Sequence, residues 1–112
     1  MKKLSKPMIT EDMKRIYDFF EKNSDVLTVV PISASKLCEL LEMTKKEISL
    51  TIKKINSLPI YKNVILGSND GYYLITKDNK SEGFKVLLDR TDKCCAELEY
   101  IQALKAKITF MV

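Results

Sequence analysis

The chain has 112 residues, of which 46% are apolar and 30% are charged, a composition that fits one soluble globular domain. No apolar run approaches the ~18–20 residues that a membrane-spanning helix needs, and no apolar segment of a signal peptide follows the basic N-terminus. We therefore expect a cytoplasmic protein without membrane contact. Histidine is absent, which removes the commonest general base and zinc ligand. We expect neither an enzyme nor a cofactor or metal site.

The net charge of +4 is concentrated in one short segment. Residues 44–62 hold five lysines and one glutamate, a local charge of +4, and the other 93 residues hold 14 charges of each sign. Such a segment is either a solvated helix face or a surface that contacts phosphates.

Three cysteines, Cys38, Cys94 and Cys95, form neither a CxxC motif nor an even set. This number and spacing predict reduced cysteines that act as small apolar residues.

The first third of the chain predicts one helix after a loose basic arm at residues 1–9. Thr10 is a suitable N-cap, and apolar residues recur at helical spacing as far as Lys22. Val26–Ile32 is a run rich in β-branched residues, which favours a short strand or an extended connection. Pro31 places that segment at an edge.

Two short helices separated by a tight turn are predicted next. Ser33 begins a helix over Ala34–Leu41, and the capping-box sequence TKKE from Thr44 begins a second helix over Lys45–Ser57. The second helix has an apolar face of Ile48, Thr51, Ile52 and Ile55, and an opposite face of Lys46, Ser49, Leu50, Lys53 and Ser57.

A β-hairpin follows. Ile60–Leu66 and Tyr72–Thr76 are strand-like, and the Asp70-Gly71 step between them is a strong hairpin signal because glycine tolerates positive φ.

The longest helical pattern runs from Glu82 to Ile108. About 26 residues at 1.5 Å each span ~40 Å, whereas a core of this size measures about 25 Å. We therefore expect part of the helix to pair with a second copy in a homodimer; the alternative is a helix that breaks and folds back on the first helix. The expected dimer seam consists of Phe84, Leu87, Leu88, Thr91, Cys94, Cys95, Leu98, Ile101, Leu104 and Ile108.

Two helices joined by a tight turn and followed by a hairpin constitute a helix-turn-helix with a wing. The segment SASKLCELLEMTKKEISLTIKKINSLPIYKNVILGSNDGYYLIT resembles small winged helix-turn-helix proteins of bacteriophages and mobile elements, in its Ser-initiated helix, the Ile52 and Ile55 pair and the Gly-Tyr-Tyr-Leu return of the wing. Arg90 matches an arginine that often follows in that group, and the resemblance covers about residues 30–108. It implies a mainly α, α+β fold, with a winged-helix domain over residues 10–77 and a dimerising C-terminal helix over residues 78–112.

The chain departs from that group in two places. Glu42 stands in the turn where glycine is frequent, so it must adopt a backbone conformation that glycine tolerates more easily. The second of the two predicted helices, Lys45–Ser57, carries lysines in place of arginines. Lysine is less able than arginine to form a pair of hydrogen bonds with guanine.

The helix-turn-helix interpretation predicts double-stranded DNA as the partner, because the second helix of such a motif enters the major groove. Ser49 is the best candidate for a base-edge hydrogen bond, and Leu50 is suited either to a thymine methyl or to a partner protein. The lysines would bind phosphates, and the wing tip would reach the backbone or minor groove. The complete expected site is Lys45, Lys46, Ser49, Leu50, Lys53, Lys54, Lys62, Ser68 and Asn69.

The leading functional hypothesis is a dimeric transcription regulator or DNA-metabolism accessory factor of a phage or mobile element, in a bacterial or phage-infected cell. The alternative is a protein–protein module that binds a replication or host factor through the winged helix or the C-terminal helix without contacting DNA.

Overall fold

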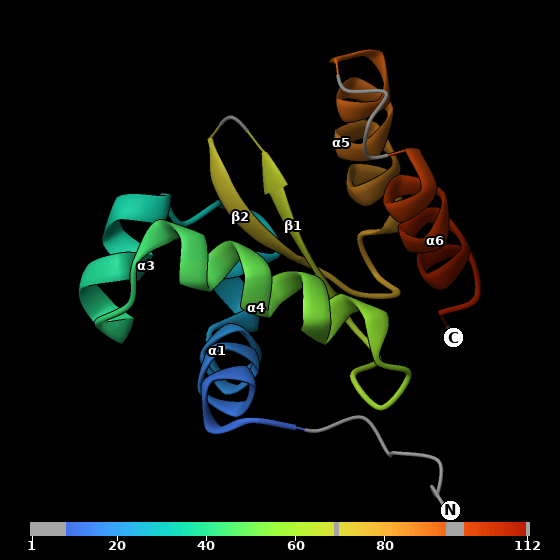
Figure 1. The fold of residues 1–112 in the computed structure, drawn as a ribbon. Helices are drawn as coiled ribbons and strands as arrows, with labels where there is room; N and C mark the ends of the chain where they lie inside the picture. Colours follow the sequence, from blue (N-terminus) through green and yellow to red (C-terminus); the bar gives the residue numbers. More distant parts are fainter. Residues whose placement is uncertain (1–8, 69, 94–97, 112) are drawn as a thin grey trace, which may run out of the picture.

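The computed structural model describes residues 9–68, 70–93 and 98–111, which form a mostly helical fold with one two-stranded antiparallel sheet (Figure 1). The expected α+β class is confirmed. In chain order the elements are α1 (Glu11–Lys22), α2 (Ser24–Leu27), α3 (Ala34–Leu41), α4 (Lys45–Ser57), β1 (Val64–Ser68), β2 (Gly71–Ile75), α5 (Lys80–Lys93) and α6 (Leu98–Thr109).

Side-chain caps fix where the first long helices begin. Thr10 and Ser33 accept hydrogen bonds from backbone N–H groups in the first turns of α1 and α3. At α4 the Thr44 hydroxyl accepts from the Glu47 N–H at 3.1 Å, and the Glu47 carboxylate accepts from the Thr44 N–H at 2.9 Å. These bonds satisfy donors that a helix leaves unpaired, so the predicted starts of α1, α3 and α4 are confirmed.

The apolar run after α1 is not a strand. Ser24–Leu27 forms the single helical turn α2, in which Leu27 is buried in the core and its neighbour Val26 is exposed. Only Ile32 is strand-like, and it exchanges two backbone hydrogen bonds with Tyr72 of β2, at 2.8 and 3.0 Å. The Ile32 carbonyl oxygen would lie 2.3 Å from a Cβ on Gly71, so this contact requires glycine there.

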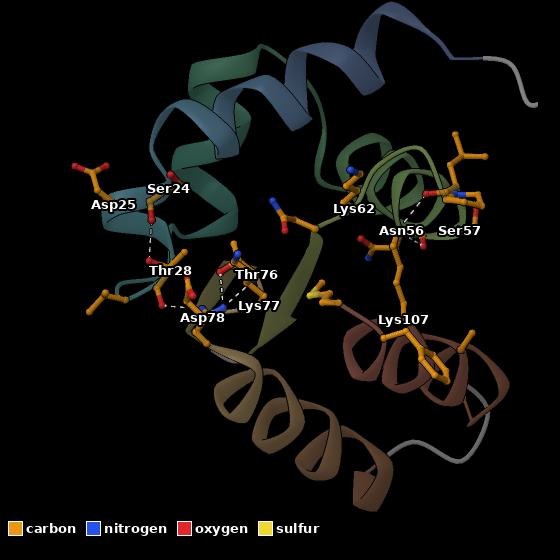
Figure 2. A pocket seen from close by; sticks show the side chains of 18 residues that line it. Ser24, Asp25, Thr28, Asn56, Ser57, Lys62, Thr76, Lys77, Asp78 and Lys107 are labelled. Atoms are coloured by element: carbon orange, nitrogen blue, oxygen red, sulfur yellow. Dashed lines mark hydrogen bonds between the residues drawn. The ribbon is translucent and has the colours of Figure 1, made fainter.

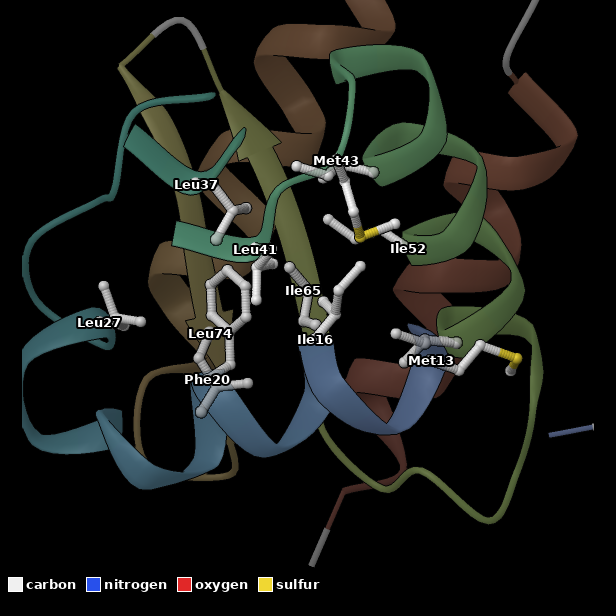
Figure 3. Packing of buried hydrophobic residues seen from close by; sticks show 12 residues of the cluster. Met13, Ile16, Phe20, Leu27, Leu37, Leu41, Met43, Ile52, Ile65 and Leu74 are labelled. Carbon is white, nitrogen blue, oxygen red and sulfur yellow. The ribbon is translucent and has the colours of Figure 1, made fainter. Parts of the chain in front are cut away.

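Both faces of the hairpin are covered. Ile65 and Leu74 point to a cluster with α1, α3 and α4, which Figure 3 shows around Ile16 and Phe20. The other face of the sheet belongs to a second cluster with α5 and α6, whose buried members are Val64, Leu66, Ile75, Leu87, Ile101, Leu104 and Ile108. The alternation of side chains along β1 therefore joins two cores through one small sheet.

The expected single C-terminal helix is wrong, because its residues form two helices, α5 and α6, that lie side by side (Figure 1). The alternative of a helix that breaks is confirmed, but the two helices pack on the sheet and on each other and not, as that alternative had it, on the first helix. Gly83 permits this packing, since a Cβ there would lie 2.9 Å from a side-chain carbon of Ile75.

This packing also buries part of the expected dimer seam. Its members Leu87, Ile101, Leu104 and Ile108 are buried within their own chain, and Phe84 packs against the same cluster. Leu88 and Leu98 are exposed, whereas Thr91, Cys94 and Cys95 lie outside the residues whose side chains are described. The homodimer stays a prediction, but the helix length that motivated it does not exist.

Glu42 ends α3 in the left-handed conformation, with φ 55° and ψ 48°, as its place in the turn predicts. This conformation costs an L-residue about 1–2 kcal/mol, and glycine avoids the cost but loses about 0.5–1 kcal/mol of chain entropy. Glu42→Gly should therefore raise the free energy of unfolding by about 0.5–1 kcal/mol in urea titrations. The matched control, Glu39→Gly within α3, should lower it by about 1 kcal/mol. A loss of stability in both variants would contradict this account.

Candidate nucleic-acid interface

The outer face of α4 is the surface that the sequence predicts to contact DNA. Ile48, Ile52 and Ile55 are buried against the first core, as predicted. On the opposite face Lys46, Ser49, Leu50 and Lys53 are all exposed, and Lys45 and Lys54 are exposed beside them. The three isoleucines anchor the helix and leave its cations in solvent.

The remaining predicted residues do not join this face. Lys62 lies in the loop before β1 and lines a different groove. At the hairpin turn the Ser68 hydroxyl donates to the Gly71 carbonyl at 3.0 Å and accepts from the Asp70 N–H at 3.2 Å, so it is engaged within the turn. Asn69 lies outside the described residues.

A cleft of about 380 Å³ separates α4 from the hairpin. Ser49 and Lys53 line one side, and residues of the hairpin, Tyr72 among them, line the other. Tyr100 of α6 also lines this cleft, and the Lys53 ammonium lies 5.4 Å from the centre of its ring. A cation over an aromatic face is attracted by the ring's quadrupole, so α6 helps to position a lysine of α4.

Asn56 ties α4 to both the sheet and α6. Its amide accepts from the Ile65 N–H and donates to the Ile65 carbonyl, each at 2.9 Å, as a neighbouring strand would. The same amide nitrogen donates to the Tyr100 hydroxyl at 2.9 Å. Asn56 is only 4% exposed, and its position four residues after Ile52 on the apolar face was the one sequence signal that could have identified it.

Lys107 of α6 caps the C-terminal end of α4. Its ammonium donates to the carbonyls of Asn56 at 2.9 Å and Leu58 at 3.2 Å. A cation at this end of a helix offsets the negative end of the helix dipole and adds hydrogen bonds to the last carbonyls, of which that of Leu58 also accepts from the Tyr61 N–H. Burial disfavours the charged form and lowers the pKa of Lys107 to about 8.

Comparisons with known protein families, with curated proteins and with solved structures found no match to this chain. Among the helices of the described residues, none is both long enough and apolar enough to cross a membrane. The structure is that of a small α+β protein in which a helix that carries exposed lysines lies beside a β-hairpin.

Asn56→Ala should lower the free energy of unfolding by about 2–4 kcal/mol, because it leaves the buried N–H and carbonyl of Ile65 without side-chain partners. Ser57→Ala is the matched control, since Ser57 is exposed and its hydroxyl donates to the Lys54 carbonyl within the same helix. It should change stability by about 0.5 kcal/mol or less. Urea titration of both variants tests this, and equal losses would refute the role assigned to Asn56.

The lowered pKa of Lys107 predicts a pH dependence of stability. As pH rises above about 8, the folded state releases this proton before the unfolded state, whose lysine keeps the ordinary pKa of 10.5. The unfolded state then binds more protons, so the free energy of unfolding should rise. The rise should be on the order of 1 kcal/mol, because the half-exposed ammonium is screened by water.

The measurement is urea unfolding from about pH 7.5 to about pH 9.5, with Lys107→Met beside the wild type. Burial raises the pKa values of Tyr17 and Tyr61 above the ordinary 10.0, so their ionisation makes stability fall, not rise, as pH increases and cannot produce the expected rise. The rise in the free energy of unfolding with pH should disappear in Lys107→Met. An equal rise in that variant would show that a group other than Lys107 causes the pH dependence.

Proposed function

We propose that this chain is a winged-helix DNA-binding protein. In this proposal α3, the turn at Glu42 and α4 are the helix-turn-helix, the β1–β2 hairpin is the wing, and α4 enters the major groove. The observation that carries the proposal is the outer face of α4, whose cations stand in solvent while three buried isoleucines hold the opposite face.

The contacts of α6 favour the N-terminal half of α4 as the part that enters the groove. Lys107 occupies the C-terminal carbonyls of α4, and Tyr100 lies against Lys53 in the second half of the helix. Lys46, Ser49 and Leu50 stand before these contacts. We assign Lys46 to phosphate, Ser49 to a base edge and Leu50 to a thymine methyl.

The distribution of charge supports the same surface. Residues 44–62 carry the whole net charge of the chain, and all five lysines of that segment are exposed. Phosphate contacts by lysines supply most of the affinity for non-specific DNA. On the sequence resemblance we further propose a regulator or DNA-metabolism accessory factor of a phage or mobile element.

The test is fluorescence anisotropy with a labelled, non-specific AT-rich duplex. The wild-type affinity should fall by about one to three decades between about 50 and about 200 mM salt, because bound lysines release counterions from the DNA. Lys46→Gln should weaken binding and reduce the slope of log affinity against log salt by about 0.9. Lys85→Gln is the matched control, since Lys85 is an exposed lysine of α5, which packs on the other face of the sheet.

Equal effects of Lys46→Gln and Lys85→Gln would remove α4 from the interface. Absence of binding at about 50 mM salt would refute DNA as the partner. The second candidate is then the protein–protein module, which the exposure of Leu40 and Leu50, each 51%, favours. Those two side chains would be the first to replace with serine in assays of partner binding.

A further inference from the structure

A second and larger groove lies away from the outer face of α4. It has a volume of about 1220 Å³ and is bounded by α2, the turn between β2 and α5, the end of α4 and the last turns of α6 (Figure 2). Two aspartates, Asp25 and Asp78, lie together with Lys77 on the side of α2 and the β2–α5 turn, whereas Lys62 and Lys107 lie on the side of α4 and α6 (Figure 2). The side of α4 and α6 therefore carries two cations and no carboxylate among the described residues that line the groove.

Lys107 is the most unusual of these groups. Its ammonium is half-buried and donates to two backbone carbonyls, yet it forms no ion pair with any carboxylate of the described residues. Burial disfavours the charged ammonium and lowers its pKa to about 8. An anion placed beside Lys107 would offset this cost of burial, and Lys62 lines the same groove.

Apolar side chains surround this cation. Ala103 lies one turn before Lys107 on α6 and Met111 follows the end of that helix, and all three line the groove. Phe110 and Val29 also line it, and they are 79% and 71% exposed. An apolar surface that is left in water beside an unpaired cation is suited to a ligand that has both an apolar body and an anionic head.

We propose that this groove binds a small amphipathic carboxylate, with its head at Lys107 and its apolar body along Phe110 and Met111. The N-terminal arm does not match this description, because residues 1–8 carry three lysines and no acidic residue. The charges orient the ligand, since the side of α4 and α6 offers Lys62 and Lys107 without a carboxylate, whereas Asp25 and Asp78 outnumber Lys77 on the other side. Because the same ammonium holds the C-terminal carbonyls of α4, the ligand contacts the group that caps this helix.

The test is titration of the DNA-free, ¹⁵N-labelled protein, followed by amide chemical shifts. The probes are decanoate and 1-naphthoate, which distinguish an aliphatic body from an aromatic one. At least one of them should shift the amides of Leu58, Ile60–Lys62 and Lys107–Met111 in a saturable manner. Decanamide and naphthamide, which lack the charge, should each bind about tenfold or more weakly than the matching acid.

Two variants assign the head group. Lys107→Met should weaken carboxylate binding about tenfold or more, and Lys107→Arg should keep it within about threefold. Lys85→Met on α5 is the matched control and should bind as the wild type does. If Lys107→Met does not fold, the comparison of acid with amide on the wild-type protein and the retained binding of Lys107→Arg decide the matter.

The proposal is overturned if neither acid shifts the groove amides, if the acids and their amides bind equally, or if Lys107→Met binds as the wild type does. These outcomes do not depend on the DNA-binding proposal, since no DNA is present.

Discussion

The pair of hydrogen bonds between the Asn56 amide and the Ile65 backbone is the interaction on which the arrangement of this protein depends. A two-stranded hairpin is at best marginally stable in water by itself. Here it is stabilised by a core on each face, and Asn56 supplies a third contact by pairing with β1 as a neighbouring strand would. Because the same amide also donates to Tyr100, helix α4, the sheet and α6 meet at one buried polar group.

Much of the fold could be predicted because its signals are local. The Thr44 capping box, the Asp70-Gly71 step and the spacing of Ile48, Ile52 and Ile55 each specify their element within a few residues, and the protein contains those elements. The division of the C-terminal segment could not be predicted from its periodicity. An apolar stripe has the same spacing whether it faces a second copy of the chain or its own sheet. Only Gly83, where a Cβ would meet Ile75, hinted at close packing.

The same difference between local and long-range signals separates the two candidate sites. The lysines of α4 were predicted because charge and spacing lie within one helix. Asn56, Tyr100 and Lys107 were not identified, because each acts through a partner distant in sequence: Tyr100 is 44 residues from Asn56, and Lys107 is 51 residues from the carbonyl that it caps. Their chemistry arises only when α6 lies against α4. Lys62 was predicted to bind DNA together with the lysines of α4, yet the path of the loop carries it into the larger groove.

The two helices at the C-terminus therefore have a role beyond covering the sheet. Through Tyr100 and Lys107, α6 contacts α4 at a lysine side chain, at a buried amide and at the terminal carbonyls. These contacts fall in the second half of α4 and resist rotation of the helix about its axis, whereas the buried isoleucines resist its translation away from the core. The first half, with Lys46 and Ser49, stays in solvent on a helix whose orientation is fixed from both sides. A helix held in this way can meet a rigid partner surface without first losing the orientational freedom that a loosely packed helix would lose on binding.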